Sequence, residues 1–186
     1  MSIATDEIET LDEAAIARLE GRYEYLNGRY VEKPPMGARA NGLAFILLAE
    51  IWLHARANRL GVCFGDSTDY RIFANEPKRT RIPDGSFIRS GRLPNNKAPE
   101  GILTIPPDLA IEVVSPNDSA VNVNERIVDL LGAGVRLLWV IYPKTRQVYV
   151  HRADGSLSLL NADDELTGED VIPGFTLRLA DLFDAI

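Results

Sequence analysis

The order of apolar and polar residues along the chain predicts short strands and three helices. Near the start, Thr10 opens a capping-box sequence in front of a short amphipathic helix. The Asn27-Gly28 pair then joins two strand-like segments, 23–26 and 29–32. This pair predicts a tight β-hairpin, because both positions of the turn tolerate positive φ.

Residues 41–59 form the longest helical pattern, and its middle, from Phe45 to Trp52, is apolar on nearly every side. Such a helix needs cover from the sheet, from neighbouring elements or from a second subunit. A homodimer is therefore one expectation for this chain.

The rest of the chain predicts strands joined by turns, with one more helix at 121–131 that Gly132 and Gly134 end. The strand-like segments are 62–64, 68–73, 85–88, 108–115, 135–142 and 146–150. Asp154-Gly155 predicts a further hairpin. A strand–helix–strand unit beside hairpins indicates an α/β fold around a mixed sheet. The glycine motifs of nucleotide-cofactor folds do not occur in the sequence.

Composition fits one domain over residues 1–186, in which residues 1–9 are expected to form a loose arm. The apolar runs are too short to span a bilayer and no basic-then-apolar leader is visible, so a cytoplasmic protein is expected. A single cysteine, Cys63, excludes an internal disulfide and a multi-cysteine zinc site, and there are only two histidines. Any metal would therefore have to be held by carboxylates.

The net charge of -7 argues against nonspecific binding to nucleic acid, which depends on neutralising phosphates. Between residues 77 and 98, however, six basic residues accompany a single acid, Asp84. These six are Lys78, Arg79, Arg81, Arg89, Arg92 and Lys97. The segment is either a solvated basic loop or a patch that contacts phosphates.

Glu112 is the one charged residue in an otherwise aliphatic strand pattern. A carboxylate in such surroundings protonates, pairs or binds a metal, because an isolated buried charge is costly. Three interpretations stay open: an ion pair with Arg126 or Arg136, a place at the exposed end of the strand, or a functional carboxylate. We expect burial and a nearby Asp84 to raise the pKa of Glu112.

Asp84 follows Pro83 and precedes Gly85, and this tripeptide alone is typical of a turn. The 28 residues from Asp84 to Glu112 are enough to bring their two strands side by side. Both carboxylates could then reach one hard cation, for which two carboxylates, a carbonyl and waters suit Mg²⁺.

Several segments of the chain, in their order and spacing, resemble the Uma-type family of putative restriction endonucleases within the PD-(D/E)XK nuclease superfamily. The segments are 23–28, Ile82-Pro83-Asp84, 110–116 and Ala133-Gly134-Val135, followed by Trp139. The resemblance runs from about Leu11 to Phe183.

This resemblance implies a restriction-endonuclease-like mixed sheet flanked by helices, with extra β-hairpins. It makes Asp84 the motif aspartate and Glu112 the motif acid of an enzyme that hydrolyses phosphodiester bonds, expected to be in DNA. The expected cofactor is Mg²⁺ or Mn²⁺, held by Asp84, Glu112 and the carbonyl of Val113.

The chain departs from the superfamily pattern where a lysine belongs, because Val114 stands two residues after the motif acid. Relatives supply that lysine from the following helix, and here the helix offers Arg126 instead. Arginine stays protonated, so it can stabilise a phosphate but is poorly suited to orient or deprotonate a water. Glu24, beside the first hairpin, is a further candidate for the site or else an ion-pairing glutamate.

Two classes of function remain from the sequence, beside a purely structural or oligomeric module. The first is a metal-dependent endonuclease with Asp84, Glu112, Arg126 and Glu24 in its active site. The second is a catalytically weakened nuclease fold that binds nucleic acid or a protein partner.

Overall fold

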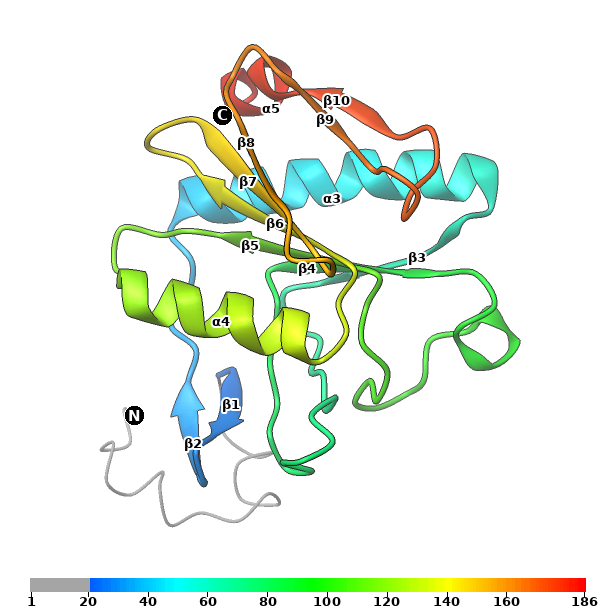
Figure 1. The fold of residues 1–186 in the computed structure, drawn as a ribbon, viewed down its shortest axis with the longest axis vertical. Coiled ribbons are helices and arrows are strands. Elements are labelled where there is room, and N and C mark those ends of the chain that lie inside the picture. The colour runs from blue at the N-terminus through cyan, green and yellow to red at the C-terminus, as the bar shows by residue number, and fades with distance from the viewer. Residues whose placement is uncertain (1–20) are drawn as a thin grey trace.

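The computed structural model describes residues 21–186, and a six-stranded mixed sheet lies at its centre (Figure 1). The strands follow one another across the sheet in chain order. They are β3 (Gly61–Gly65), β4 (Gly85–Arg89), β5 (Leu109–Val113), β6 (Leu137–Tyr142), β7 (Gln147–Arg152) and β8 (Leu157–Leu160). The segment before β5 also contains a short 3₁₀ helix, η1 (Pro94–Asn96).

Only β5 and β6 run parallel, and all other neighbouring strands are antiparallel. The chain returns from the end of β5 to the start of β6 through helix α4 (Ala120–Gly132), the crossover that a parallel pair requires. Ser119 caps this helix by accepting a hydrogen bond from the Asn122 amide at 3.1 Å. The turn after the helix uses Gly134 at φ 99°, a conformation that glycine adopts without strain.

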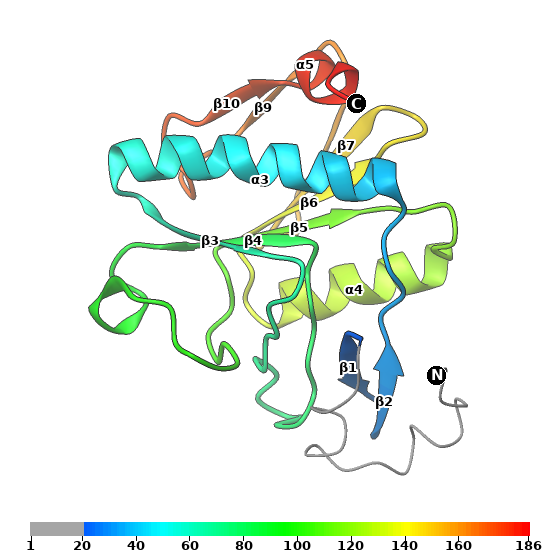
Figure 2. The same cartoon turned by 180° about the vertical axis from the view of Figure 1, so that it is seen from behind.

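Helix α3 (Ala38–Asn58) covers one face of the sheet and α4 covers the other, as Figures 1 and 2 show from opposite sides. The C-terminal hairpin, β9 (Glu165–Thr167) with β10 (Thr176–Arg178), and helix α5 (Leu179–Asp184) lie on the α3 side. The larger hydrophobic core fills that side, and alternate side chains of β5 and β6 point into it. The α4 side holds a smaller core built on Ala110, Leu138 and Val140.

A separate hairpin, β1 (Tyr23–Leu26) with β2 (Arg29–Glu32), lies on the α4 side of the sheet without joining it. Its turn places Asn27 at φ 52° and Gly28 at φ 87°, as the sequence predicts. Polar contacts attach it to the loop before β4. The Tyr25 amide donates to Thr80 Oγ1 at 2.7 Å, and the Thr80 amide donates to the Tyr25 carbonyl at 3.1 Å.

The predicted fold class, an α/β mixed sheet flanked by helices with extra hairpins, is confirmed. The prediction of a strand over 68–73 is wrong: Tyr70 forms only isolated bridges, to Arg81 and to Leu103. Its ring is buried and its hydroxyl lies 2.7 Å from Ser86 Oγ, so tertiary packing accounts for the apolar pattern. The helix predicted near Thr10 lies outside the described residues.

Helix α3 leaves part of its apolar surface uncovered, with Phe45, Trp52 and Leu53 exposed. No helix in the described part of the chain is long and apolar enough to cross a membrane.

Candidate active site

Asp84 lies just before β4, where its amide still pairs with the sheet by donating to the Ile111 carbonyl at 3.0 Å. The residue is buried, and both oxygens of its carboxylate accept hydrogen bonds. Oδ2 accepts from the Val113 amide at 2.8 Å, and Oδ1 accepts from Nζ of Lys33 at 2.7 Å. The sheet therefore fixes this carboxylate against the end of β5.

Glu112 lies on β5, a central strand of the sheet, and is also buried. Alternation along the strand places it on the α4 side with Ala110, while its neighbours Ile111 and Val113 belong to the α3-side core. Its Oε2 atom is buried and accepts no hydrogen bond from the described residues, although Nε of Arg126 lies 3.0 Å away. The pair is thus an electrostatic contact without hydrogen-bond alignment.

Burial raises the pKa of Glu112 to about 8, and the neighbouring Asp84 carboxylate acts in the same direction. Lys33 and Arg126 oppose this shift but do not cancel it. The expectation of a raised pKa is confirmed, and the surroundings of Glu112 favour its protonated form in the absence of a further cation.

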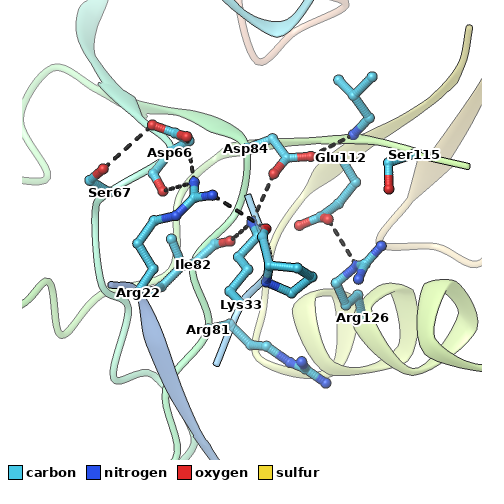
Figure 3. A network of polar contacts seen from close by, with 12 residues as sticks. Arg22, Lys33, Asp66, Ser67, Arg81, Ile82, Asp84, Glu112, Ser115 and Arg126 are labelled. Carbon is cyan, nitrogen blue, oxygen red and sulfur yellow. Dashed lines mark hydrogen bonds and ion pairs between the residues drawn. The ribbon is translucent and has the colours of Figure 1, made fainter. Parts of the chain in front are cut away.

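Lys33 is the cation that inspection of the sequence missed. It follows β2 directly, and its side chain is only 9% exposed. Nζ donates to the Ile82 carbonyl as well as to Asp84 (Figure 3). Burial works to lower the pKa of Lys33, but Glu112 and then Asp84 outweigh it and raise the pKa. The ammonium therefore stays charged beside the two acids.

Arg126 projects from α4 toward the same carboxylates. One of its terminal nitrogens donates to Asp118 Oδ1 at 2.8 Å, and Asp118 Oδ2 accepts from the Ser115 amide at 2.8 Å. Burial works to lower the pKa of Arg126, but the carboxylates of Glu112 and Asp118 raise it. The turn between β5 and α4 thus holds the guanidinium in place over Glu112.

Glu24 lies on β1 beside this cluster, with both carboxylate oxygens engaged. Oε1 accepts from the Ile82 amide at 2.8 Å, and Oε2 pairs with Nη1 of Arg81 at 2.8 Å. Arg81 continues to Asp129 on α4, with Nε 2.8 Å from Oδ2. The geometry gives Glu24 an anchoring contact between hairpin and sheet, and it does not line the cavity of the two acids.

The two acids and two cations meet in one small cavity of about 40 Å³. Its lining includes Lys33, Asp84, Glu112, Val113 and Arg126. This volume exceeds the roughly 10–15 Å³ that a single water requires. The lining side chains come from four separate parts of the chain.

The carboxylates of this cavity are the side chains that could hold a divalent cation of the Mg²⁺ type. Within residues 21–186, no group of three or more His, Cys, Asp or Glu side chains is arranged to hold a metal, and the carboxylates that line the cavity belong to Asp84, Glu112 and Asp118. Mg²⁺ is commonly bound by one or two carboxylates and keeps several waters. The buried Oε2 of Glu112, which lacks a hydrogen-bond donor among the described residues, is the atom that such a cation would satisfy.

The basic segment 77–98 does not form one free surface. Arg79 and Arg81 both bind Asp129, and Nη1 of Arg92 pairs with Asp108 at 2.7 Å. These three residues are therefore committed to ion pairs within the fold, which leaves Lys78, Arg89 and Lys97 for the phosphate contacts considered above.

Fold and cavity together define the chain as an α/β protein of the restriction-endonuclease-like class, with paired acids at the junction of two central strands. Residues 6–180 match the model of the Uma2 family, described as putative restriction endonuclease, and the chain belongs to this family.

A solved structure with a similar fold is described as a putative nuclease belonging to DUF820 from Anabaena variabilis ATCC 29413. It is 23% identical, aligns with a TM-score of 0.78, and the match covers 91% of this chain and 95% of that one. At this identity, the likeness concerns the fold alone. No curated protein matches the chain.

Proposed function

We propose that this protein is a metal-dependent endonuclease that hydrolyses phosphodiester bonds in DNA. The observation that carries the proposal is the burial of Asp84 and Glu112 in one cavity with two cationic side chains, Lys33 and Arg126. Membership of a family described as restriction endonucleases supports the same reaction class. Two acids are costly to bury together unless a positive charge joins them.

In this proposal, Asp84, Glu112 and the Val113 carbonyl hold one Mg²⁺ or Mn²⁺. Such an ion, when bound, polarises the phosphate and makes water more acidic. The Val113 amide orients Asp84 by donating to its Oδ2 at 2.8 Å. Glu112 must lose its proton before it can act as a ligand, since burial raises its pKa to about 8.

Lys33 takes the place of the lysine that the strand lacks at Val114. Its ammonium is compact and carries three donors, of which two go to the Ile82 carbonyl and to Oδ1 of Asp84, so one remains for a phosphate oxygen or the attacking water. Arg126 presents a planar, permanently charged group on the other side of Glu112, which suits the charge that develops on the phosphate.

Glu24 acts on the reaction indirectly, through the residues that it holds in place. Its carboxylate binds Arg81 and the Ile82 amide, while the Ile82 carbonyl accepts from Lys33. Glu24 thereby fixes the segment that holds the Lys33 ammonium, and we assign it a positioning role.

The test is a plasmid-nicking assay with Mg²⁺ or Mn²⁺ on wild type, Asp84→Asn and Glu112→Gln. Both substitutions keep the shape of the side chain and remove its charge. Glu100→Gln, an exposed glutamate outside the cavity, is the matched control. Cleavage by wild type and the control, with loss in both site variants, supports the endonuclease. Absence of cleavage of DNA and RNA by wild type contradicts it.

A nuclease fold that binds nucleic acid or a protein partner without cleaving is the second candidate. Both oxygens of Asp84 are already engaged, by Lys33 and by the Val113 amide, which favours a cluster that is stable without a metal. Metal-dependent cleavage separates the candidates: an enzyme cuts DNA with Mg²⁺ or Mn²⁺ and loses this activity in Asp84→Ala, whereas a non-catalytic module can bind the ion without cutting.

A homodimer through the uncovered face of α3 is also part of the proposal. Phe45, Trp52 and Leu53 are exposed there. Light scattering on wild type and on Phe45→Ser/Leu53→Ser distinguishes a dimer from a monomer.

A further inference from the structure

A pocket of about 530 Å³ adjoins the candidate active site. It lies between the first turn of α3, the segment that follows β5 and the turn from β6 to β7. Ser115 lines both this pocket and the cavity of Asp84 and Glu112, so the two spaces are neighbours. A molecule bound in the pocket would therefore be separated from the two carboxylates by Ser115 alone.

The wall of the pocket is largely apolar and includes an aromatic ring. Ala40, Pro116 and Tyr142 contribute this surface. The Tyr142 ring packs against Tyr149, with 5.1 Å between ring centroids and a 58° angle between planes. This contact supports the ring in position, and a flat apolar group can stack on such a surface.

Two cationic side chains that line the pocket have no ion-pair partner among residues 21–186. Arg39 and Lys144 both line it and are exposed, and neither side chain forms a hydrogen bond or ion pair with any of residues 21–186. Among residues 21–186, no acidic residue lines the pocket. Its charge is therefore positive, in contrast to the net charge of -7 for the whole chain.

The space on the other side of the candidate site is lined by charges of both signs. This second pocket, of about 310 Å³, shares Lys33 and Arg126 with the carboxylate cavity. Three glutamates line it, Glu24, Glu32 and Glu125, and so do Arg29 and Arg81. A polyanion that reaches the site is therefore attracted to the pocket of Arg39 and Lys144, where no Asp or Glu of residues 21–186 offsets the two cations.

We propose that the pocket of Arg39, Tyr142 and Lys144 binds one unpaired nucleotide next to the phosphodiester that is cleaved. The base stacks on the apolar wall with Tyr142, and its phosphate is bound by Arg39 and Lys144. The volume lies within the roughly 300–1,000 Å³ typical of small-ligand pockets, which suits one nucleotide and not a paired duplex. The inference rests on the proposed endonuclease function and specifies its substrate as single-stranded or locally opened DNA.

The test measures binding by fluorescence anisotropy, with fluorescein-labelled dT12 and a 12-base-pair duplex in Ca²⁺ at low salt. We expect wild type to bind dT12 more tightly than the duplex. Tyr142→Leu should weaken dT12 binding by about 5- to 150-fold, the range for loss of one stacked base. Tyr142→Phe keeps the ring and should stay within about twofold of wild type on the same stacking argument.

Arg39→Ala/Lys144→Ala tests the cations against a matched loss of charge. The control, Lys78→Ala/Lys97→Ala, removes two exposed positive charges outside the pocket. A larger loss of dT12 affinity in the pocket variant than in the control supports the inference. Equal losses in both variants, or unchanged binding by Tyr142→Leu, overturn it. Thermal melting of each variant establishes that it is folded.

Cleavage of circular single-stranded DNA separates this inference from the proposed function. If wild type cleaves and the pocket variants keep the same KM, the pocket inference fails and the endonuclease stands. If dT12 binds through the pocket residues and no DNA is cut, the pocket stands and the endonuclease fails. If wild type neither binds nor cleaves DNA, both are overturned.

Discussion

Lys33 and Asp84 are 51 residues apart in the chain, and the ammonium of the first donates to Oδ1 of the second at 2.7 Å in a buried ion pair. The hydrogen bond places a positive charge on an oxygen that a divalent cation would also use. Lys33 therefore has two roles in the proposed enzyme, as a counter-ion before metal binding and as a donor to substrate afterwards.

Replacing Lys33 with methionine should tighten metal binding and abolish cleavage. The change removes a competing cation, so we expect Mn²⁺ affinity to rise by about tenfold, equivalent to roughly 1.4 kcal/mol. Isothermal titration calorimetry measures the affinity, and plasmid nicking measures the activity. Lys97→Met, at an exposed site, is the control. Weaker Mn²⁺ binding by Lys33→Met would show that the lysine does not compete with the metal.

The raised pKa of Glu112 predicts opposite effects of pH on metal binding and on stability. Only the ionised carboxylate binds a metal, so Mn²⁺ affinity should rise by about tenfold per pH unit up to about pH 8. A folded-state pKa of about 8 against an ordinary 4.5 gives stability that is complete below the ordinary value and is lost as pH rises through the folded one.

Urea unfolding of metal-free protein between pH 5 and 8 checks the stability effect. Relative to Glu112→Gln, which does not titrate, wild type should lose on the order of 1 kcal/mol per pH unit. A constant difference between the two proteins across this range would contradict the raised pKa.

Arg126 should contribute to the rate of cleavage and tolerate replacement by lysine. Removal of a positive charge that stabilises a transition state typically lowers kcat by about 10²–10³-fold. We expect that loss in Arg126→Ala, and near wild-type nicking in Arg126→Lys, because a cation remains beside Glu112. Glu125→Ala, on the same helix and exposed, is the control. Wild-type rates in Arg126→Ala would remove this residue from the mechanism.

Glu24 should matter for the attachment of the hairpin. Glu24→Ala breaks the buried ion pair with Arg81, which keeps Asp129, and leaves the Ile82 amide without its acceptor, a loss that typically costs about 1–3 kcal/mol. Glu32→Ala, exposed on the same hairpin, should stay within about 0.5 kcal/mol of wild type. Chemical denaturation gives both values. If the two variants are equally stable, the Glu24–Arg81 contact does not hold the hairpin.

Local sequence signals predicted the elements that depend on local geometry. Asn27-Gly28 predicted the first hairpin, and the aliphatic run around Glu112 predicted the central strand. Both features depend mainly on residues that are adjacent in the sequence. The main helix begins at Ala38, three residues before the predicted Asn41. Capping residues and packing determine where a helix ends more than the spacing of its apolar residues does.

Contacts between distant residues set the features that the sequence did not reveal. Lys33 follows an ordinary hairpin strand, and only the fold brings it to Asp84. Arg79 and Arg81 looked free in a basic segment, but Asp129, about 50 residues later, binds both. No periodic pattern or residue spacing in the sequence identifies either contact.

The β1–β2 hairpin shares no backbone ladder with the six-stranded sheet, yet it delivers Lys33 to the carboxylates. Because its attachment consists largely of side-chain contacts, it can open while the sheet stays intact. In that opened form the protein keeps its native core, but Lys33 no longer lies beside Asp84. The hairpin is thus a detachable part of the proposed active site, and hydrogen exchange of the Tyr25 amide, which donates to Thr80 Oγ1 across the attachment, relative to Ile111 would measure how often it detaches.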